Sequence, residues 1–274
     1  NPHSLPNRTI VRSVLAGPDH QIYVGGQDEL GYFSPDKAGK LVYHSLLNSI
    51  PQADRSFGDV WDIVRLNNDI WFRCAKQLFK YSGSAIAAYR APSEWGFLES
   101  VNGKLYAQDF EKGLMVYENN AWRGLFANNP GPADDVITGL HALEGSQILV
   151  TYLKNGVFVA DGEGLKPILS KDLNAIKASR IYATASLSEK RWALATNTDG
   201  LYIIDRNGNR VQHFGQQEGL QNNNVLSVFT DRNGNLWLGL DNGIDYIAFN
   251  SAIKLINPGE GNAAAYAALV HGGS

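Results

Sequence analysis

The stretch Asn224–Ile247, which reads NVLSVFTDRNGNLWLGLDNGIDYI, determines the fold that the sequence predicts. In the first strand, Val225, Ser227 and Phe229 alternate with Leu226, Val228 and Thr230, which is the period of a pleated strand with mixed faces. Asn233-Gly234 predicts a two-residue hairpin turn in which both residues have positive φ. Leu236–Leu238 is expected to be the second strand, and Ile244–Ile247 the third after another turn. If the rest of the chain repeats this unit, the fold follows from it.

Similar units occur along the whole chain. The segment Ser13–Gly25 aligns without a gap onto Ser227–Gly239, and Leu30–Phe33 aligns onto Ile244–Ile247. Four further copies lie between them, and most copies are followed by a fourth short strand, clearest at 41–43, 122–124, 210–214 and 252–255. We therefore predict blade cores at about residues 9–45, 58–91, 95–125, 136–169, 179–215 and 223–257.

The spacing of the copies predicts a β-propeller. One marker residue in the second strand of each copy gives intervals of 48, 35, 43, 43 and 45 residues; the markers are Tyr23, Trp71, Tyr106, Leu149, Trp192 and Trp237. This is the period of four-stranded propeller blades. The fold class is therefore all-β, with four-stranded antiparallel blades in a single domain over residues 1–274. Helical patterns are nearly absent, and Ser170–Ala178 is expected to form a short helix between blades.

Six complete blades leave segments at both ends that suggest a seventh. His3–Pro6 is expected to be an outer strand, and Ala263–Val270 an inner strand, within a further blade that starts near residue 262. Propellers close into a ring, which leaves few sheet edges free. We expect the chain to be a fragment of a longer protein.

Composition excludes several classes of function. The net charge of −3 offers no general attraction to phosphate backbones, so nucleic-acid binding is disfavoured. A single cysteine, Cys74, excludes an intrachain disulfide and a cysteine-based zinc cluster. The longest apolar run, Ala263–Val270, is too short to cross a bilayer. We expect no cofactor, and no membrane contact by this piece.

The repeat resembles that of the two-component regulator propeller family. The resemblance rests on Asp231–Gly239 (DRNGNLWLG) with Asn242–Ile244, and on the similar turn at Asp205–Asn209. Thr9–Val14, Ile22–Gly26 and Glu29–Phe33 resemble the first propeller of the triple-tyrosine subgroup.

The resemblance implies a periplasmic sensor domain of a bacterial membrane receptor. In such receptors a propeller precedes a triple-tyrosine domain, a transmembrane helix and a histidine kinase or DNA-binding output. The partners that it implies are the remaining domains of the receptor and a second copy of the propeller. None of these segments is visible in this sequence.

Candidate ligand-binding residues lie in the loops that enter the first strand and that join the second and third strands of each blade. Such loops gather on one face of a propeller, where a rigid scaffold lets them vary. Aromatic, amide and charged groups together suit a glycan or a peptide. Arg73 stands out, because a charge at its position needs a partner or a ligand. The predicted binding residues are Gln27, Asp28, Glu29, Trp61, Arg73, Gln108, Phe110, Tyr152, Asn197, Asp241 and Asn242.

Catalytic and metal-binding signals are weak by comparison. Asp54, Asp59, Asp134 and Asp135 would be available as glycosidase carboxylates, but sequence spacing cannot bring two of them together. The six histidines are scattered and form no metal-ligand pair. The oxygens of Asp231–Asn235 alternate as in a calcium loop, yet a hairpin turn explains them fully. A non-catalytic sensor is therefore favoured; a propeller glycosidase or lyase and a protein-interaction scaffold are the alternatives.

Overall fold

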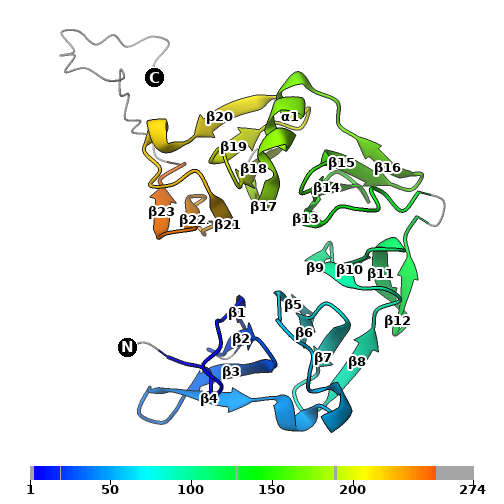
Figure 1. Ribbon diagram of the computed structural model, residues 1–274, viewed down its shortest axis with the longest axis vertical. Helices are drawn as coiled ribbons and strands as arrows, with labels where there is room; N and C mark the ends of the chain where they lie inside the picture. The colour runs from blue at the N-terminus through cyan, green and yellow to red at the C-terminus, as the bar shows by residue number, and fades with distance from the viewer. Residues whose placement is uncertain (1–2, 19, 127–128, 188–189, 251–274) are drawn as a thin grey trace.

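The fold is a β-propeller, as predicted, and the described residues form six blades. The computed structural model describes residues 3–18, 20–126, 129–187 and 190–250. The blades lie around a central axis, with the first strand of each blade innermost (Figure 1). The predicted fourth strand at 252–255 and the predicted blade start at 262–274 lie outside the described residues.

Five blades have four antiparallel strands in sequential order, and three strands are described in the sixth. Blade 1 contains β1 (Ser13–Ala16), β2 (Ile22–Gly26), β3 (Glu29–Pro35) and β4 (Leu41–Ser45). Blade 2 contains β5 (Asp62–Leu66), β6 (Asp69–Arg73), β7 (Gln77–Tyr81) and β8 (Ile86–Arg90). Blade 3 contains β9 (Trp95–Val101), β10 (Lys104–Asp109), β11 (Gly113–Glu118) and β12 (Ala121–Gly124).

The other three blades follow the same plan. Blade 4 contains β13 (Ile137–Ala142), β14 (Ile148–Tyr152), β15 (Gly156–Asp161) and β16 (Gly164–Pro167). Blade 5 contains β17 (Ile181–Leu187), β18 (Arg191–Thr196), β19 (Leu201–Ile204) and β20 (Arg210–Phe214). Blade 6 contains β21 (Val225–Thr230), β22 (Leu236–Leu240) and β23 (Ile244–Ile247).

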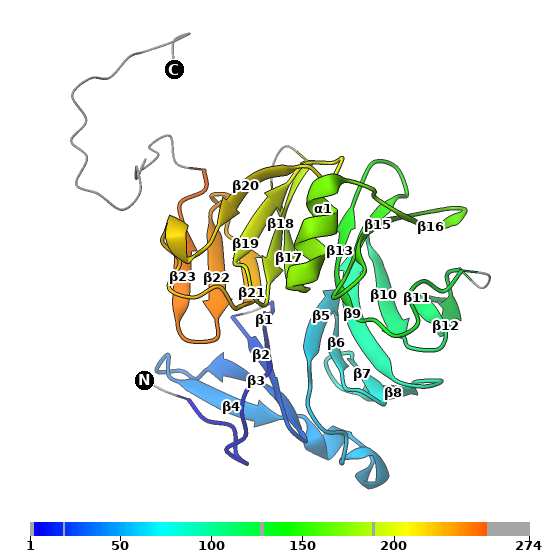
Figure 2. The same ribbon diagram turned by 45° about the horizontal axis from the view of Figure 1, so that its top comes forward.

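The short helix expected between blades is present. α1 (Lys171–Ile176) continues as a 3-10 turn over Lys177–Ser179 and lies between blades 4 and 5 (Figure 2). The Ser170 hydroxyl accepts a hydrogen bond from the Leu173 N–H at 2.9 Å, which caps the first turn. Leu173 and Ile176 are buried and belong to the apolar cluster shared by these two blades.

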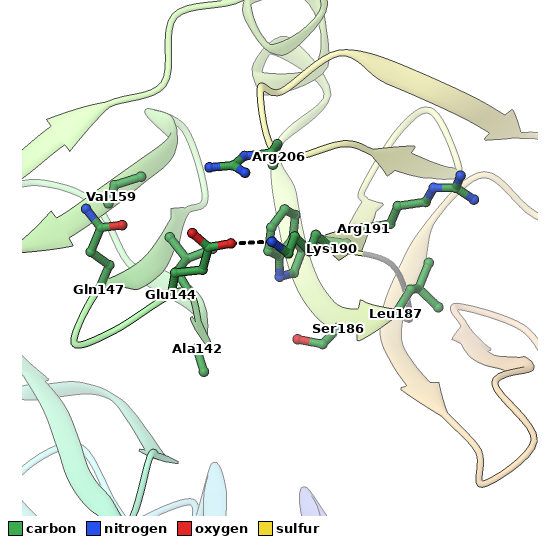
Figure 3. A pocket seen from close by; sticks show the side chains of 11 residues that line it. Ala142, Glu144, Gln147, Val159, Ser186, Leu187, Lys190, Arg191 and Arg206 are labelled. Atoms are coloured by element: carbon green, nitrogen blue, oxygen red, sulfur yellow. Dashed lines mark hydrogen bonds and ion pairs between the residues drawn. The ribbon is translucent and has the colours of Figure 1, made fainter.

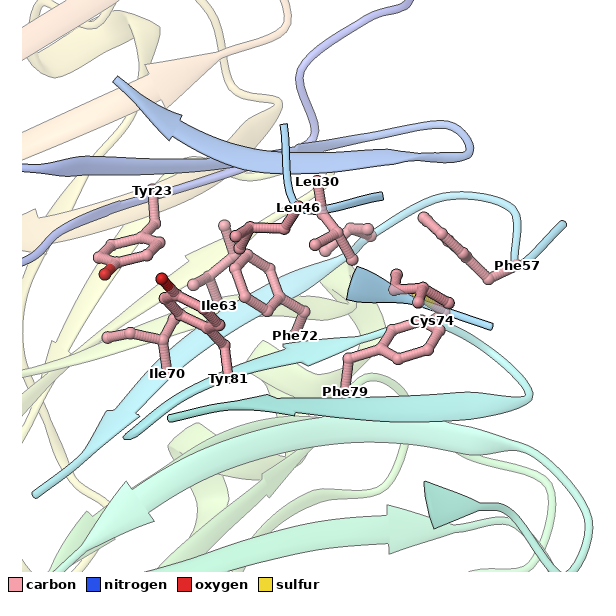
Figure 4. Packing of buried hydrophobic residues seen from close by; sticks show 12 residues of the cluster. Tyr23, Leu30, Leu46, Phe57, Ile63, Ile70, Phe72, Cys74, Phe79 and Tyr81 are labelled. Atoms are coloured by element: carbon pink, nitrogen blue, oxygen red, sulfur yellow. The ribbon is translucent and has the colours of Figure 1, made fainter. Parts of the chain in front are cut away.

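The core of the molecule lies between neighbouring blades. In the cluster drawn in Figure 4, Tyr23 and Leu30 of blade 1 meet Ile63, Phe72 and Phe79 of blade 2. Side chains alternate across each strand, so a middle strand that lies between two blades contributes one set to the preceding blade and the other set to the following blade. Consecutive inner strands pack from β1 through to β21, whereas β21 and β1 are not extensively packed within the described residues.

Strand pairing corrects one of the sequence markers. Trp192 belongs to the cluster shared with blade 4, whereas the other markers from Tyr23 to Leu149 belong to clusters shared with the following blade. The residue of blade 5 that faces blade 6 is Ala193. The prediction was therefore one residue off in this blade, because a tryptophan was chosen over the small residue that packs beneath blade 6.

The turn of the opening stretch also differs from the prediction. Gly234 has φ +76°, but Asn233 is not among the residues with positive φ. The Asp231 carboxylate accepts hydrogen bonds from the N–H groups of Asn233 and Asn235 at 2.8 and 2.9 Å. These backbone donors keep the pKa of Asp231 below its usual value. The loop is therefore an Asp-capped turn that ends in a left-handed glycine, not a two-residue hairpin with two positive φ angles.

The segment predicted as an outer strand at His3–Pro6 is not a strand. It has no ladder partner among the described residues and turns at Pro6. Leu5 is nevertheless buried, and the His3 ring lies 5.4 Å from that of Phe33 in β3. The segment packs on blade 1 through side chains because Pro6 has no N–H to donate to a ladder.

Candidate functional site

Most of the residues predicted to bind a ligand hold the propeller together instead. In blade 1, one Asp28 carboxylate oxygen accepts hydrogen bonds from the N–H groups of residues 57–58, both at 2.7 Å. Glu29 is buried and accepts hydrogen bonds from the hydroxyls of Tyr43 at 2.9 Å and Ser45 at 2.7 Å. Both acids are therefore occupied by partners within the fold.

Two amides of the predicted set join neighbouring blades. The Gln108 amide is buried; it donates to the carbonyl of Asp135 at 2.7 Å and accepts from the N–H of Ile137 at 2.8 Å. The Asn197 amide donates to the side-chain oxygen of Asn224 at 3.2 Å. Each bond links the end of one blade's second strand to the entry of the next blade, so these amides position the loops.

Arg73 has the partner that its charge requires. Its Nε forms a hydrogen-bonded ion pair with Asp62, and its Nη1 donates to the carbonyl of Trp95 at 2.9 Å. The same carboxylate oxygen of Asp62 accepts the N–H of Leu98 at 3.1 Å. The guanidinium thus joins blades 2 and 3, and no ligand is required to balance it.

Of two further aromatic residues in the predicted set, Tyr152 belongs to the core and Phe110 is partly buried. Tyr152 is buried, its ring centroid lies 5.2 Å from that of Phe158, and burial raises its pKa. Phe110 is partly buried, and its N–H donates to the carbonyl of Glu94 at 3.2 Å. Neither ring is presented as an open stacking surface.

Four predicted residues are exposed at the loop face: Trp61, which is described below, and Gln27, Asp241 and Asn242. Gln27 forms an isolated bridge with Asp59, and its carbonyl accepts the side-chain amide of Asn7 at 2.9 Å. Asp241 and Asn242 occupy the turn between β22 and β23. These side chains are accessible, but Gln27 lies on blade 1 whereas Asp241 and Asn242 lie on blade 6. No described pocket contains any of the three.

A repeated β-bulge defines a better candidate site, which pattern reasoning did not find. In blades 3 to 6 the ladder between the first two strands skips one residue near the start of the inner strand. In blades 1 and 2 the N–H groups of the corresponding residues bond to Gly25 and Arg73. Bulges re-aim side chains at the rims of sheets. We call six residues the mouth positions: the four bulge residues Gly96, Thr138, Tyr182 and Leu226, and their counterparts Arg12 and Trp61, which directly precede the regular ladders of blades 1 and 2.

Trp61 is the most prominent of the mouth positions and belongs to the predicted set. It remains 44% exposed, although it follows the buried Val60. The guanidinium of Arg12 lies 5.2 Å from the centroid of its ring, and Arg12 also pairs with Asp59 at 3.5 Å. Cation–π contact holds an exposed indole in place, so it becomes an ordered stacking surface.

Tyr182 offers a second exposed ring at the mouth, and the sequence pattern did not reveal it. Its side chain is 42% exposed, while its neighbours Ile181 and Ala183 turn toward the blades. Strand alternation alone cannot locate such a residue, because the bulge shifts the phase of the alternation. Alignment of the blade copies could have located Tyr182, because it occupies the same position in its copy as Trp61, one residue before the regular pairing begins.

The carboxylates considered for glycosidase chemistry do not form a catalytic pair: most have polar partners within the fold, and Asp134 is exposed. Asp54 accepts hydrogen bonds from Arg90 at 2.7 Å and Gln77 at 3.3 Å. Asp135 is buried and accepts three bonds from residues 154–155 at 2.8 to 2.9 Å. Asp134 is exposed. Nothing in the described part of the chain pairs two of them across a cavity.

The described pocket with the largest set of lining residues lies on the opposite face. It encloses about 390 Å³ between blades 4 and 5, where the turns after β13, β17 and β19 meet (Figure 3). Leu143 and Trp192 provide apolar lining, while Glu144 forms an ion pair with Lys190 beside Arg206. These turns join the first to the second and the third to the fourth strands, whereas the predicted site used the loops at the other end.

Two half-buried ionisable groups on the inner strands were also missed. Burial raises the pKa of Glu99 in β9 to about 7, although its carboxylate accepts the N–H of Ser100 at 2.9 Å. Burial lowers the pKa of His141 in β13 to about 4, and its Nε2 lies 2.7 Å from the hydroxyl of Thr184. Because the pKa of each group departs from its ordinary value, we expect each to make the stability of the fold depend on pH.

Metal and membrane signals are absent from the described residues. Within 3–18, 20–126, 129–187 and 190–250, no group of three His, Cys, Asp or Glu side chains could hold a metal ion. None of the helices in this part of the chain combines the length and the apolar character that a membrane crossing requires.

Comparison with known families finds a match to one copy of the repeat. The model of the family described as two component regulator propeller matches residues 219–242, the end of the blade 5 connection and the first two strands of blade 6. This confirms the resemblance: the chain is a β-propeller that carries the two-component regulator repeat. No curated protein matches it in sequence.

Solved structures share the fold at low sequence identity. The extracellular domain of a putative hybrid two-component system from B. thetaiotaomicron is 17% identical with a TM-score of 0.69; the match covers 93% of this chain and 34% of that one. The chain therefore spans about a third of that protein. Virginiamycin B lyase from Staphylococcus aureus is 11% identical with a TM-score of 0.66, covering 92% and 88%. YCF48 from Cyanidioschyzon merolae is 12% identical with a TM-score of 0.60, covering 85% and 80%.

Proposed function

We propose that this propeller is a non-catalytic sensor module of a bacterial signalling receptor and that it binds a glycan or a peptide at the mouth positions. The observation that carries the proposal is the pair of exposed rings at the mouth positions, Trp61 in contact with Arg12 and Tyr182 at a β-bulge. Exposed rings stack on the apolar C–H faces of sugars or on peptide side chains. Arg12 adds hydrogen-bond donors beside one of these rings.

The family repeat supports the signalling part of the proposal. The propeller of a two-component system shares the fold over nearly the whole of this chain. The receptor's remaining domains and a second copy of the propeller are the proposed partners, and the extracytoplasmic side of the membrane is the proposed location. Ligand binding would act by favouring one of two receptor arrangements, in proportion to its different affinity for them.

A screen of glycans and peptides by thermal shift tests the proposal. A ligand that raises the melting temperature of the parent protein is expected to bind at least ten-fold more weakly to Trp61→Ala and to Tyr182→Ala. Val42→Ala is the matched control, because Val42 is also exposed but lies on the outer strand β4. Equal binding by all four proteins would exclude the mouth as the site.

A lyase or glycosidase remains the second candidate, because one structural relative is a lyase. Incubation of each stabilising ligand with the protein, followed by mass spectrometry, separates the two. Unchanged ligand supports the sensor, whereas a cleaved product would replace it with an enzyme. A protein that responds to no small molecule would favour the interaction scaffold.

A further inference from the structure

One face of the blade 6 sheet is rich in aromatic residues and is uncovered. Phe229, Trp237 and Tyr246 are direct cross-strand partners, so their side chains form one row across β21, β22 and β23. They are 64%, 45% and 49% exposed. The alternating residues on the other face, such as Leu238, are buried against blade 5. We call the exposed row the aromatic face.

The position of Trp237 is buried in every other blade. Its counterparts in blades 1 to 5 are at most 6% exposed and pack toward the following blade; they are Tyr23, Trp71, Tyr106, Leu149 and Ala193. The aromatic face is therefore the surface that the repeat normally buries beneath the next blade. Among the described residues no blade lies there.

The opposite wall of this opening shows the matching exposure. Val14 of β1 is 61% exposed, whereas its counterparts Ile63, Leu98 and Leu140 are buried against the preceding blade. The outer part of the same side of blade 1 is covered, since the His3 ring contacts Phe33 and Leu5 is buried. The uncovered part is the part that an inner strand covers in the other blades.

We propose that Ala263–Val270 of this chain is the occupant: it forms the inner strand of a seventh blade between the aromatic face and Val14. These eight apolar or small residues, AAAYAALV, include no charge, which suits a strand that is covered on both faces. The predicted outer strand of blade 6 ends at Leu255, so seven residues, 256–262, precede this strand.

That connection length agrees with the described blades. Four residues, 91–94, separate β8 from β9, and sixteen, 46–61, separate β4 from β5. Seven residues lie between these limits. The seventh blade would also bring the beginning of the chain, which covers the outer part of blade 1, and the end of blade 6 into one unit.

Cross-linking of the full chain tests this placement. Val14→Cys is combined with Tyr266→Cys, Ala267→Cys or Ala268→Cys, so that both phases of the strand are covered, and each protein is treated with a short bis-maleimide. At least one pair is expected to link within a single chain at several-fold higher yield than Val14→Cys alone. The native Cys74 is buried and adds little background. Val42→Cys on β4 with the same three partners is the matched control and is expected not to link.

Hydrogen exchange gives a second readout that does not depend on cysteine geometry. Peptides from β21 to β23 are expected to exchange several-fold faster in a chain ending at Asn250 than in the full chain. Links that form only between two chains would show that a second copy covers the aromatic face, and would overturn the proposal. Unchanged exchange together with no intrachain link would overturn it as well.

Discussion

Arg73 of β6 and Asp62 of β5 form an ion pair that joins two blades, because the guanidinium also donates to the carbonyl of Trp95 and the carboxylate accepts the N–H of Leu98. Asp62 lies at the start of the inner strand, one residue after Trp61. The guanidinium of Arg73, whose charge suggested a ligand, therefore connects blades 2 and 3 next to the mouth position Trp61.

Removing this guanidinium is expected to destabilise the protein strongly. Arg73→Met leaves the Asp62 carboxylate partly buried without its counter-charge, and such changes cost about 3 kcal/mol of unfolding free energy. Urea denaturation measures the loss. Arg90→Met is the control, because the Arg90 side chain is mostly exposed, and its midpoint is expected to match that of the parent. If Arg73→Met were as stable as the parent, the structural role of Arg73 would be wrong.

Asp135 and Asp134 are adjacent but are expected to respond very differently to substitution. Asp135→Ala removes a buried acceptor and leaves three donors of residues 154–155 without their partner, so we expect a loss of about 2 kcal/mol. Asp134→Ala changes an exposed side chain and should leave the unfolding free energy unchanged. Thermal denaturation of both variants compares them directly, and equal losses would contradict the hydrogen-bond assignment.

Glu99 is expected to make the protein less stable as the pH rises. Its pKa is about 7 in the folded protein against an ordinary value of 4.5, so the folded state holds the proton more tightly than the unfolded chain. The stabilisation is complete below pH 4.5 and is lost as the pH rises through 7. Glu99→Gln removes the ionisation and should gain about 2 kcal/mol relative to the parent between pH 5 and pH 8.

Urea denaturation of Glu99→Gln at four pH values across this range measures the gain. Glu111→Gln, at an exposed loop position, is the control and should follow the pH curve of the parent. A constant difference between Glu99→Gln and the parent at all four values would show that Glu99 does not titrate near neutral pH.

His141 is expected to act in the opposite direction. Burial lowers its pKa from 6.5 to about 4, so the unfolded chain binds the proton more tightly than the folded protein. The contribution is fully present above pH 6.5 and is lost as the pH falls toward 4. His141→Gln can still bond to Thr184 without titrating, and its stability should fall about 2 kcal/mol less than that of the parent between pH 7 and pH 4.

Thermal denaturation across this acid range, with the exposed His44→Gln as control, checks the assignment. Parallel curves for the parent and His141→Gln would contradict the buried, neutral imidazole.

The fold could be predicted from the sequence because a blade repeats its own local signals. Alternation of apolar residues between turns located the strands, and the regular interval between copies identified the propeller. The marker in blade 5 was misplaced by one residue because Trp192 was preferred over the small Ala193. Ala193 faces blade 6 and is buried against the leucines of β22, which a single copy of the repeat does not reveal. The turn at Asn233-Gly234 was wrong because the Asp231 side chain favours a longer loop.

The candidate site could be predicted only in part. Loop position correctly indicated Trp61 as accessible, but it also selected Asp28, Gln108 and Arg73, whose polar groups are used between blades or loops. These partners lie on segments about 20 to 30 residues away in the sequence, so local patterns do not report them. Tyr182 was missed because a bulge changes the phase of its strand.

At the bulges, the side chain available for ligand recognition is not tied to the hydrogen bonds that pair the strands. A bulge residue such as Thr138 or Leu226 is skipped by the ladder, so its side chain can change while the strands around it keep their partners. Tyr182 and Leu226 can therefore vary on an unchanged frame, whereas a side chain at Gly96 would meet the Gln108 amide. Ligand specificity could therefore change in evolution through a few substitutions at such positions. Protein design could use the same positions without altering the strand pairing of any blade.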